Sequence, residues 1–155
     1  MELMSLIIGK PAPDFSLVNQ FGETVSLSSF KGKKNVVVLF YPFAFSGICT
    51  GELCALRDDL SAFHNDDAEL LAISCDPMYS LKAYGEAEGY SFQLLADFWP
   101  HGDVATSYGV FLEEKGFATR GTFIIDKKGI LRWQVVNGPG EARDVTDYKE
   151  ALAAL

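Results

Sequence analysis

The chain has 155 residues, of which 48% are hydrophobic and 22% are charged, and its formal net charge is −8 at pH 7. This length suits one well-packed domain, and an acidic chain without a basic stripe is a poor binder of nucleic acid or anionic membranes. No apolar run approaches the roughly 20 residues that span a bilayer, and Met1 to Ile8 lacks the basic start of a signal peptide.

The first part of the chain predicts a hairpin and then a buried strand. Pro11 opens the ordered part, and the segments 14–18 and 24–27 are short strand candidates on either side of a turn at residues 20–23. Residues 35–41 form a continuous apolar run of strand length. Such a run is typical of a central strand that is buried on both faces.

Helices and strands alternate through the middle of the chain. A helix is predicted from about Gly47 to Phe63 because apolar residues recur at helical spacings there. Its apolar positions are Ile48, Leu53, Leu56, Leu60 and Phe63. The elements predicted after it are a buried strand at 69–75, a helix at 80–88 ended by Gly89, a strand at 93–96 and a short helix at 104–108.

The last part of the chain predicts a second hairpin and a final helix. Residues 122–126 and 130–136 flank a turn with Gly129 at its tight position, and residues 144–155 are rich in Ala, Leu, Glu and Lys. This order of elements describes a mixed-sheet α/β domain over residues 1–155. The thioredoxin fold with an added N-terminal hairpin has this order, although periodicity alone does not choose it over other three-layer α/β folds.

The chain has three cysteines, Cys49, Cys54 and Cys75, and no export signal. An odd number argues against a secreted disulfide framework and for a reducing compartment such as the cytoplasm. There, a cysteine is an inert core residue, a metal ligand or a reactive thiol. His64 and His101 match no zinc-ligand spacing, so we expect no metal site.

Cys49 falls where the predicted helix begins, after a buried strand that ends at Pro42. Free backbone N–H groups and the positive end of the helix dipole converge at such a position. Both stabilise a thiolate, which is the nucleophilic form. Ser46 can place its hydroxyl beside the sulfur or cap the helix. At this point a reactive cysteine and a buried structural one remain equal alternatives.

Pro42, Ser46 and Cys49 match the pattern Pro-x-x-x-(Thr/Ser)-x-x-Cys. This segment resembles the active-site loop of peroxiredoxins, with the less common Ser in place of Thr. The resemblance extends over nearly the whole chain, because residues 10–15 are similar to the family's opening segment and residues 120–126 to its arginine-bearing strand. It implies a thioredoxin-like fold and a thiol-dependent peroxidase.

Two peroxiredoxin subgroups are represented in this one sequence. Residues 97–102 and 139–144 resemble the AhpE subgroup, whereas the spacing Cys49-x4-Cys54 resembles the PrxQ, or bacterioferritin-comigratory, subgroup. The resemblance implies reduction of hydrogen peroxide and organic hydroperoxides without a cofactor. It also implies a thioredoxin-like protein or a low-molecular-weight thiol as reductant, and a homodimer.

The resemblance assigns roles to individual residues. Cys49 would attack the peroxide and become a sulfenic acid, and Arg120 would stabilise the thiolate and hold the peroxide. The hydroxyl of Ser46 and the N–H of Cys49 would donate to the bound oxygen, and Pro42 would shield the sulfur. Glu52, one turn beyond Cys49, either orients Arg120 or is an exposed acid favoured by the helix dipole.

Cys54 is the nearest partner for resolving the sulfenic acid of Cys49 as an intramolecular disulfide. Five helical residues separate the Cα atoms by about 8.7 Å and by about 140° around the axis, whereas a disulfide needs them within about 7 Å. We therefore expect oxidation to unwind the helix around these residues. The alternative for Cys54 is a core helix position, and Cys75 is expected to be structural.

Other functions remain as alternatives. A disulfide oxidoreductase expects Cys-x-x-Cys at the helix start, but the residue three beyond Cys49 is Glu52. A peroxide-sensing relay that passes oxidation to a partner and a purely structural interaction domain are the non-enzymatic alternatives. Phe43, Phe45 and Trp99 are expected in the core or in the pocket wall, where they would favour organic hydroperoxides.

Overall fold

The computed structural model describes residues 6–155. The prediction that Met1 to Ile8 is not a signal peptide concerns mostly residues 1–5, which lie outside the described residues. Within residues 6–155, no helix combines the length and the apolar character that crossing a membrane requires.

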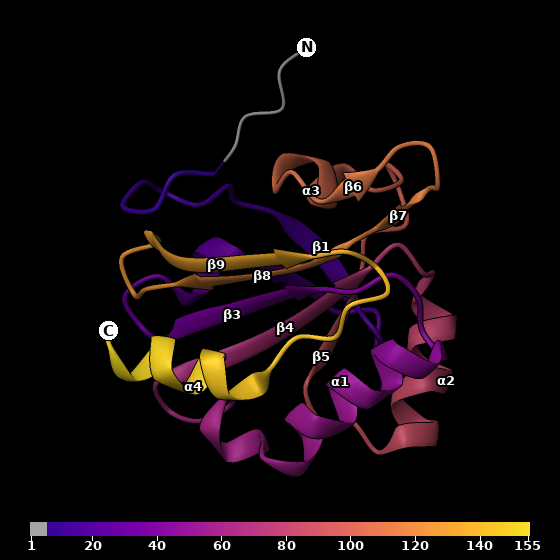
Figure 1. Ribbon diagram of the computed structural model, residues 1–155, viewed down its shortest axis with the longest axis horizontal. Coiled ribbons are helices and arrows are strands. Elements are labelled where there is room, and N and C mark those ends of the chain that lie inside the picture. The colour runs from indigo at the N-terminus through magenta and orange to yellow at the C-terminus, as the bar shows by residue number, and fades with distance from the viewer. Residues whose placement is uncertain (1–5) are drawn as a thin grey trace.

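A mixed sheet of seven strands forms the centre of the molecule, in the order β2-β1-β5-β4-β3-β8-β9 (Figure 1). The strands are β1 (Ser16–Asn19), β2 (Thr24–Ser26), β3 (Asn35–Phe40), β4 (Ala68–Ser74), β5 (Gln93–Ala96), β8 (Arg120–Ile125) and β9 (Leu131–Asn137). The three strands β3, β4 and β5 are parallel, and antiparallel hairpins extend the sheet at both edges. The predicted mixed α/β sheet with an N-terminal hairpin is confirmed.

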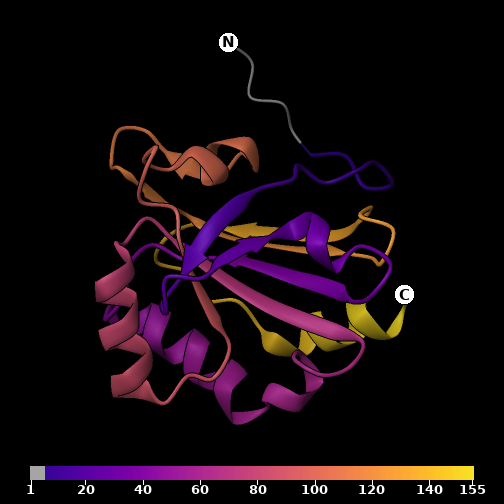
Figure 2. The same ribbon diagram turned by 180° about the vertical axis from the view of Figure 1, so that it is seen from behind.

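Helices cover both faces of this sheet. They are α1 (Gly47–Asp58), α2 (Met78–Glu88), α3 (Asp103–Ser107) and α4 (Val145–Ala153). The helices α1, α2 and α4 lie on one face, and α3 lies over the other together with a small hairpin of β6 (Phe111–Leu112) and β7 (Phe117–Ala118) (Figures 1 and 2). Turns of 3-10 helix occur at Leu27–Phe30 and Leu60–Ala62.

Strand β3 shows why its sequence is a continuous apolar run. Val36, Val38 and Phe40 belong to one buried cluster, whereas Val37 and Leu39 belong to the cluster on the opposite face. Successive side chains of a strand point to opposite faces, so a strand covered on both sides must be apolar at every position.

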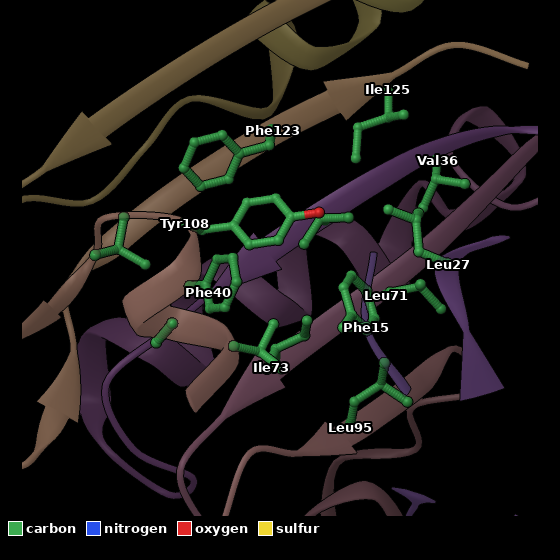
Figure 3. Packing of buried hydrophobic residues seen from close by; sticks show 14 of the residues in the cluster. Phe15, Leu27, Val36, Phe40, Leu71, Ile73, Leu95, Tyr108, Phe123 and Ile125 are labelled. Carbon is green, nitrogen blue, oxygen red and sulfur yellow. The ribbon is translucent and has the colours of Figure 1, made fainter. Parts of the chain in front are cut away.

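Aromatic rings fill the face that α3 covers. Tyr108, at the end of α3, packs against Phe40 and Phe123, with ring centroids 5.4 and 5.1 Å apart (Figure 3). The Tyr108 hydroxyl donates to the carbonyl of Pro13 at 2.6 Å. The core on this face therefore also fixes the segment that leads into β1.

The structure corrects the predicted helix 47–63 in two respects. Helix α1 ends at Asp58, and a separate 3-10 turn precedes the buried Phe63. Ile48, expected on the apolar side, is 41% exposed, whereas its neighbour Cys49 is fully buried, so Ile48 lies on the solvent side of the first turn. The hairpin of β6 and β7 was not predicted, since its two-residue strands are too short to show a period.

The β8–β9 turn gives a test of backbone conformation. Gly129 has a φ of +81°, and an added Cβ would meet no atom within 4 Å. We expect Gly129→Ala to lower the free energy of unfolding by about 1 kcal/mol, because only the left-handed backbone is penalised. Gly140, which is equally uncrowded but has no positive φ, supplies the control Gly140→Ala. Equal effects in urea denaturation would contradict this explanation.

Candidate active site

The candidate site lies at the end of the sheet where the parallel strands finish. Chain direction places the residues after β3, β4 and β5 at this edge, which is where open α/β sheets bind ligands. Tyr41 extends the pairing of β3 through its N–H, which donates to Ile73 O at 3.0 Å. Pro42 is buried next to it, and the loop 42–46 then leads into α1.

Cys49 lies in the first turn of α1 and is fully buried. The first helical bond is donated by Thr50 N to Ser46 O at 2.9 Å. Within residues 6–155, the amides of residues 47, 48 and 49 make no hydrogen bond. Three free N–H donors and the positive end of the helix dipole therefore lie at the turn that carries the sulfur.

The loop before α1 is held in a defined shape. The Asp76 carboxylate, just after β4, accepts hydrogen bonds from Ala44 N at 2.8 Å and from the Ser74 hydroxyl at 2.7 Å. Phe45 has a φ of +68°, a left-handed conformation that is uncommon outside glycine. This reversal turns the chain so that Ser46 reaches the N-cap position.

Ser46 occupies the N-cap of α1, but its side chain makes no capping hydrogen bond. Of the two alternatives for its hydroxyl, capping the helix is therefore wrong, and a place beside the sulfur stays a prediction. Within the described part of the chain, the hydroxyl has no hydrogen-bond partner, and the residue is half-buried. It is free to bind a ligand near the start of the helix.

Arg120 begins β8 and reaches the same end of the sheet. Thr122 lies opposite Leu39 of β3, and continuing this register brings Arg120 beside Tyr41. The Arg120 side chain is only 2% exposed, and its Nη1 donates to Glu52 Oε1 at 2.5 Å. Its Nε donates to Pro139 O at 2.7 Å. Among residues 6–155, its Nη2 makes no hydrogen bond.

Glu52 is buried between two arginines. Arg143 donates to Glu52 Oε2 from its backbone N at 2.7 Å and from Nε at 2.9 Å, and to Oε1 from Nη2 at 2.9 Å. Burial acts to raise the pKa of Glu52, but the hydrogen bonds and charge of Arg143, with the charge of Arg120, outweigh it and lower that pKa. The expectation of an exposed acid is wrong, and the alternative that places Glu52 on Arg120 matches the geometry.

Arg143 was not predicted as a site residue. It lies in the loop between β9 and α4, 91 residues from Glu52 in the sequence. Its Nη1 also donates to Gly121 O and to the Thr122 hydroxyl, at 2.9 and 3.0 Å. The only signal in the sequence was its place in the segment 139–144, which carried the subgroup resemblance but no role.

The arginine–glutamate cluster leaves one unbalanced positive charge beside α1. Glu52 is three residues beyond Cys49, so both side chains lie on neighbouring positions of one helix face. Two guanidinium groups face one carboxylate there. Such a charge distribution, together with free amides, can stabilise a thiolate and hold a small oxygen-bearing ligand.

The other two cysteines have different surroundings. Cys54 faces the end of α2, where its Sγ lies 3.6 Å from Glu88 Oε2 and 3.5 Å from the Tyr90 hydroxyl. Cys75 is buried, and burial together with the charges of Asp97 and Asp76 raises its pKa to about 12. Such a thiol remains protonated at neutral pH, which agrees with the structural role predicted for Cys75. All three thiols are free.

The aromatic residues near the loop lie at the surface. Phe43, Phe45 and Trp99 are 45, 57 and 81% exposed, so their assignment to the core is wrong. They belong to loops that project beyond the end of the sheet, where the core cannot cover them. The ring of Phe45 packs on Tyr84 with centroids 4.9 Å apart.

Comparison with known proteins agrees with this geometry. The model of the AhpC/TSA family matches residues 8–134. Alkyl hydroperoxide reductase E of Mycobacterium tuberculosis is 49% identical over 150 residues, covering 97% of this chain and 98% of the relative. Peroxiredoxin tpx1 of Schizosaccharomyces pombe is 38% identical over 162 residues, covering 98% of this chain and 83% of the relative.

A solved structure agrees as well. The crystal structure of peroxidoxin BcpB from Mycobacterium tuberculosis superposes with a TM-score of 0.85 at 29% identity, covering 97% of this chain and 98% of that chain. The fold is therefore thioredoxin-like, as the resemblance to peroxiredoxins implied. The chain belongs to the AhpC/TSA family and is a peroxiredoxin, a thiol-dependent peroxidase.

Proposed function

We propose that Cys49 is the peroxide-reducing thiolate and that Arg120, Ser46, Pro42 and Glu52 form its site. The observation that carries this proposal is the meeting of a buried cysteine, an uncapped helix start and a buried cluster with excess positive charge. The uncapped helix start and the excess positive charge both favour an anionic sulfur over a neutral thiol, and they oppose burial, which disfavours the charged form.

In the first step, the Cys49 thiolate attacks one oxygen of the hydroperoxide. The S–O bond forms as the O–O bond breaks, and the leaving alkoxide or hydroxide takes up a proton. The free Nη2 of Arg120, the Ser46 hydroxyl and the amides at the helix start are the donors for the charge on the oxygens. Pro42 shields the sulfur, and Glu52 holds Arg120 in place through the bond at 2.5 Å.

The loop 42–46 and the first residues of α1 control access to the sulfur. Since Cys49 has no exposed surface, this loop must move to admit a substrate. The exposed rings of Phe43 and Phe45 lie on it and offer apolar contact to an organic group. They support the reduction of organic hydroperoxides as well as hydrogen peroxide, in line with the name of the mycobacterial relative.

In the second step, Cys54 resolves the sulfenic acid of Cys49 as a disulfide. The two arginine contacts hold Glu52, so the proposed unwinding is confined to the turn before it. Gly47 and Gly51 flank Cys49 in this turn, and an added Cβ at either would meet no atom within 4 Å. Neither glycine is needed for packing, and Gly51, which lies inside the helix, weakens it by about 1 kcal/mol relative to alanine, whereas Gly47 at the first helical position weakens it less.

The remaining parts of the proposal concern the cellular context. A thioredoxin-like protein or a low-molecular-weight thiol would reduce the disulfide, the chain would act as a homodimer, and its location would be cytoplasmic. We also propose that residues 1–155 fold as one domain, which is supported by a sheet that joins strands from both ends of the chain.

We expect Cys49→Ser to reduce peroxide turnover with dithiothreitol to the background rate, because a serine hydroxyl is not ionised at neutral pH. Cys75→Ala is the matched control and should retain turnover, since that thiol lies outside the site. Consumption of cumene hydroperoxide and hydrogen peroxide measures both. Turnover by the Cys49→Ser protein would remove the basis of the proposed function.

Arg120→Lys tests the guanidinium geometry. The substitution keeps the charge but loses the planar fork of donors, so we expect the rate of Cys49 oxidation to fall by about 10²-fold. Arg132→Lys is the control because Arg132 is 45% exposed and pairs only with Asp126 among residues 6–155. The rate of Cys49 oxidation in both variants is measured by stopped flow. An unchanged rate for Arg120→Lys would exclude Arg120 from the reaction.

The proposed unwinding can be tested through Gly51→Ala. A more stable helix turn should slow disulfide formation by about fivefold, which corresponds to the roughly 1 kcal/mol difference in helix propensity. In the wild-type protein, amides 50–54 should exchange faster in the oxidised than in the reduced form, because their helical acceptors belong to the unwound turn. Identical exchange in both forms would rule out unwinding.

A further inference from the structure

Cys54 lies in a polar setting that the peroxide-reducing site does not use. Helix α1 presents it to the end of α2, where its Sγ has two oxygen neighbours, Glu88 Oε2 at 3.6 Å and the Tyr90 hydroxyl at 3.5 Å. In geometric terms the thiol donates to Glu88. A core cysteine would instead be surrounded by apolar side chains.

Arg57 connects helix α1 to Glu88. It lies three residues beyond Cys54 on the same helix, and its Nη1 donates to Glu88 O at 2.7 Å. The same Nη1 is 3.9 Å from Glu88 Oε2. These contacts hold the last turn of α2 against α1, so Glu88 and Cys54 remain neighbours when the turn before Glu52 unwinds.

The Tyr90 hydroxyl belongs to a chain of hydroxyl groups. Its single proton has two acceptors within reach, the Tyr84 hydroxyl at 3.4 Å and Thr50 O at 3.5 Å, and the Tyr84 hydroxyl lies 3.0 Å from Thr50 Oγ1. Burial raises the pKa of Tyr90, so this phenol stays protonated at neutral pH and cannot take up a proton as phenolate. Of the two neighbours of Cys54, only the carboxylate can accept one.

Glu88 can also exchange that proton with water. Its side chain is 31% exposed, whereas the site carboxylate, Glu52, is enclosed by two arginines. A general base must lie within hydrogen-bond reach of the proton that it removes and must be able to release it afterwards. Glu88 meets both conditions, with the longer distance that a sulfur donor allows.

We propose that Glu88 is the general base of the resolving step, an inference that rests on the proposed disulfide between Cys49 and Cys54. Glu88 takes the proton of the Cys54 thiol, and the thiolate attacks the sulfur of the Cys49 sulfenic acid. The S–S bond forms as the S–O bond breaks, and the hydroxide that leaves takes the proton from Glu88 as water. Cys54 is oxidised, Cys49 is reduced by the same electron pair, and Glu88 returns to its starting state.

The same contacts assign Tyr90 a positioning role. Unwinding of the turn removes Thr50 from Tyr84 and Tyr90, because Thr50 lies in the segment that moves. The Tyr90 hydroxyl then loses its acceptor Thr50 O, so fewer acceptors compete with the Cys54 sulfur, 3.5 Å away, for its proton. Its stabilisation of charge on the attacking thiolate would therefore increase once the helix has opened.

The test follows the sulfenic acid and the disulfide after one equivalent of hydrogen peroxide, with dimedone trapping and mass spectrometry of the full chain. In Glu88→Gln we expect disulfide formation to slow by about tenfold or more at pH 7, because the attacking thiol then has no neighbouring carboxylate to take its proton. The deficit should shrink as the pH approaches 9, because hydroxide in the solvent can then remove the proton in place of Glu88.

Glu86→Gln is the matched control, since Glu86 lies on the same helix, is exposed and makes no hydrogen bond with Cys54 among residues 6–155. It should form the disulfide at the wild-type rate. Glu88→Asp keeps a carboxylate and should retain more of the rate than Glu88→Gln. Trapped sulfenic acid on Cys49 in each variant verifies that the peroxide site is intact.

Three outcomes would overturn the role of Glu88 alone: a wild-type rate in Glu88→Gln, an equal deficit in Glu86→Gln, or a deficit of constant size from pH 6 to 9. The last would indicate a structural effect instead of proton transfer. By contrast, a wild-type protein that keeps its sulfenic acid and forms no Cys49–Cys54 disulfide would refute the resolving mechanism itself.

Discussion

The buried contact between Glu52, Arg120 and Arg143 is the constraint on which the rest of the site depends. A carboxylate taken out of water is costly unless hydrogen bonds and opposite charges replace its hydration. Here Glu52 receives donors from both arginines, and its pKa is lowered in spite of burial. The cluster joins helix α1, strand β8 and the loop before α4, so three distant parts of the chain meet at the turn that carries Cys49.

The excess positive charge of this cluster links packing to chemistry. One carboxylate cannot neutralise two guanidinium groups, and the remaining charge lies beside a helix start whose amides are free. Stabilising an anion there requires no rearrangement, which is the condition for effective electrostatic catalysis. In the proposed reaction, the same field favours both the thiolate before attack and the charge that develops on the peroxide oxygens.

In the proposed mechanism, activation and resolution make opposite demands on the same helix turn. The turn would be helical while its amides point at the sulfur, and it would open for Cys49 to reach Cys54. Two uncrowded glycines lower the free-energy cost of opening the turn. Glu52, which is held by two arginines, limits how far the unwinding extends along the helix. The two cysteines therefore have different neighbours. Cys49 lies at the free amides beside the arginine cluster, whereas Cys54 lies next to Glu88 and Tyr90.

The sequence by itself determined the order of elements, the two-sided burial of β3 and β4, and the position of Cys49 at a helix start. These features are local, because hydrophobic period and turn residues report the burial of each segment without reference to its partners. The motif of Pro42, Ser46 and Cys49 is likewise contained in eight consecutive residues. For this reason the mixed α/β class and the place of Cys49 at a helix start could be predicted.

Only the tertiary structure decided which charged side chains meet. Glu52 contacts Arg120 and Arg143 across 68 and 91 residues, and Cys54 contacts Glu88 across 34. Such pairs leave no period in the sequence, so Arg143 and Glu88 were not found and Glu52 remained ambiguous. The exposure of Phe43, Phe45 and Trp99 was decided in the same way, since an aromatic residue in a loop is buried only if another element covers it.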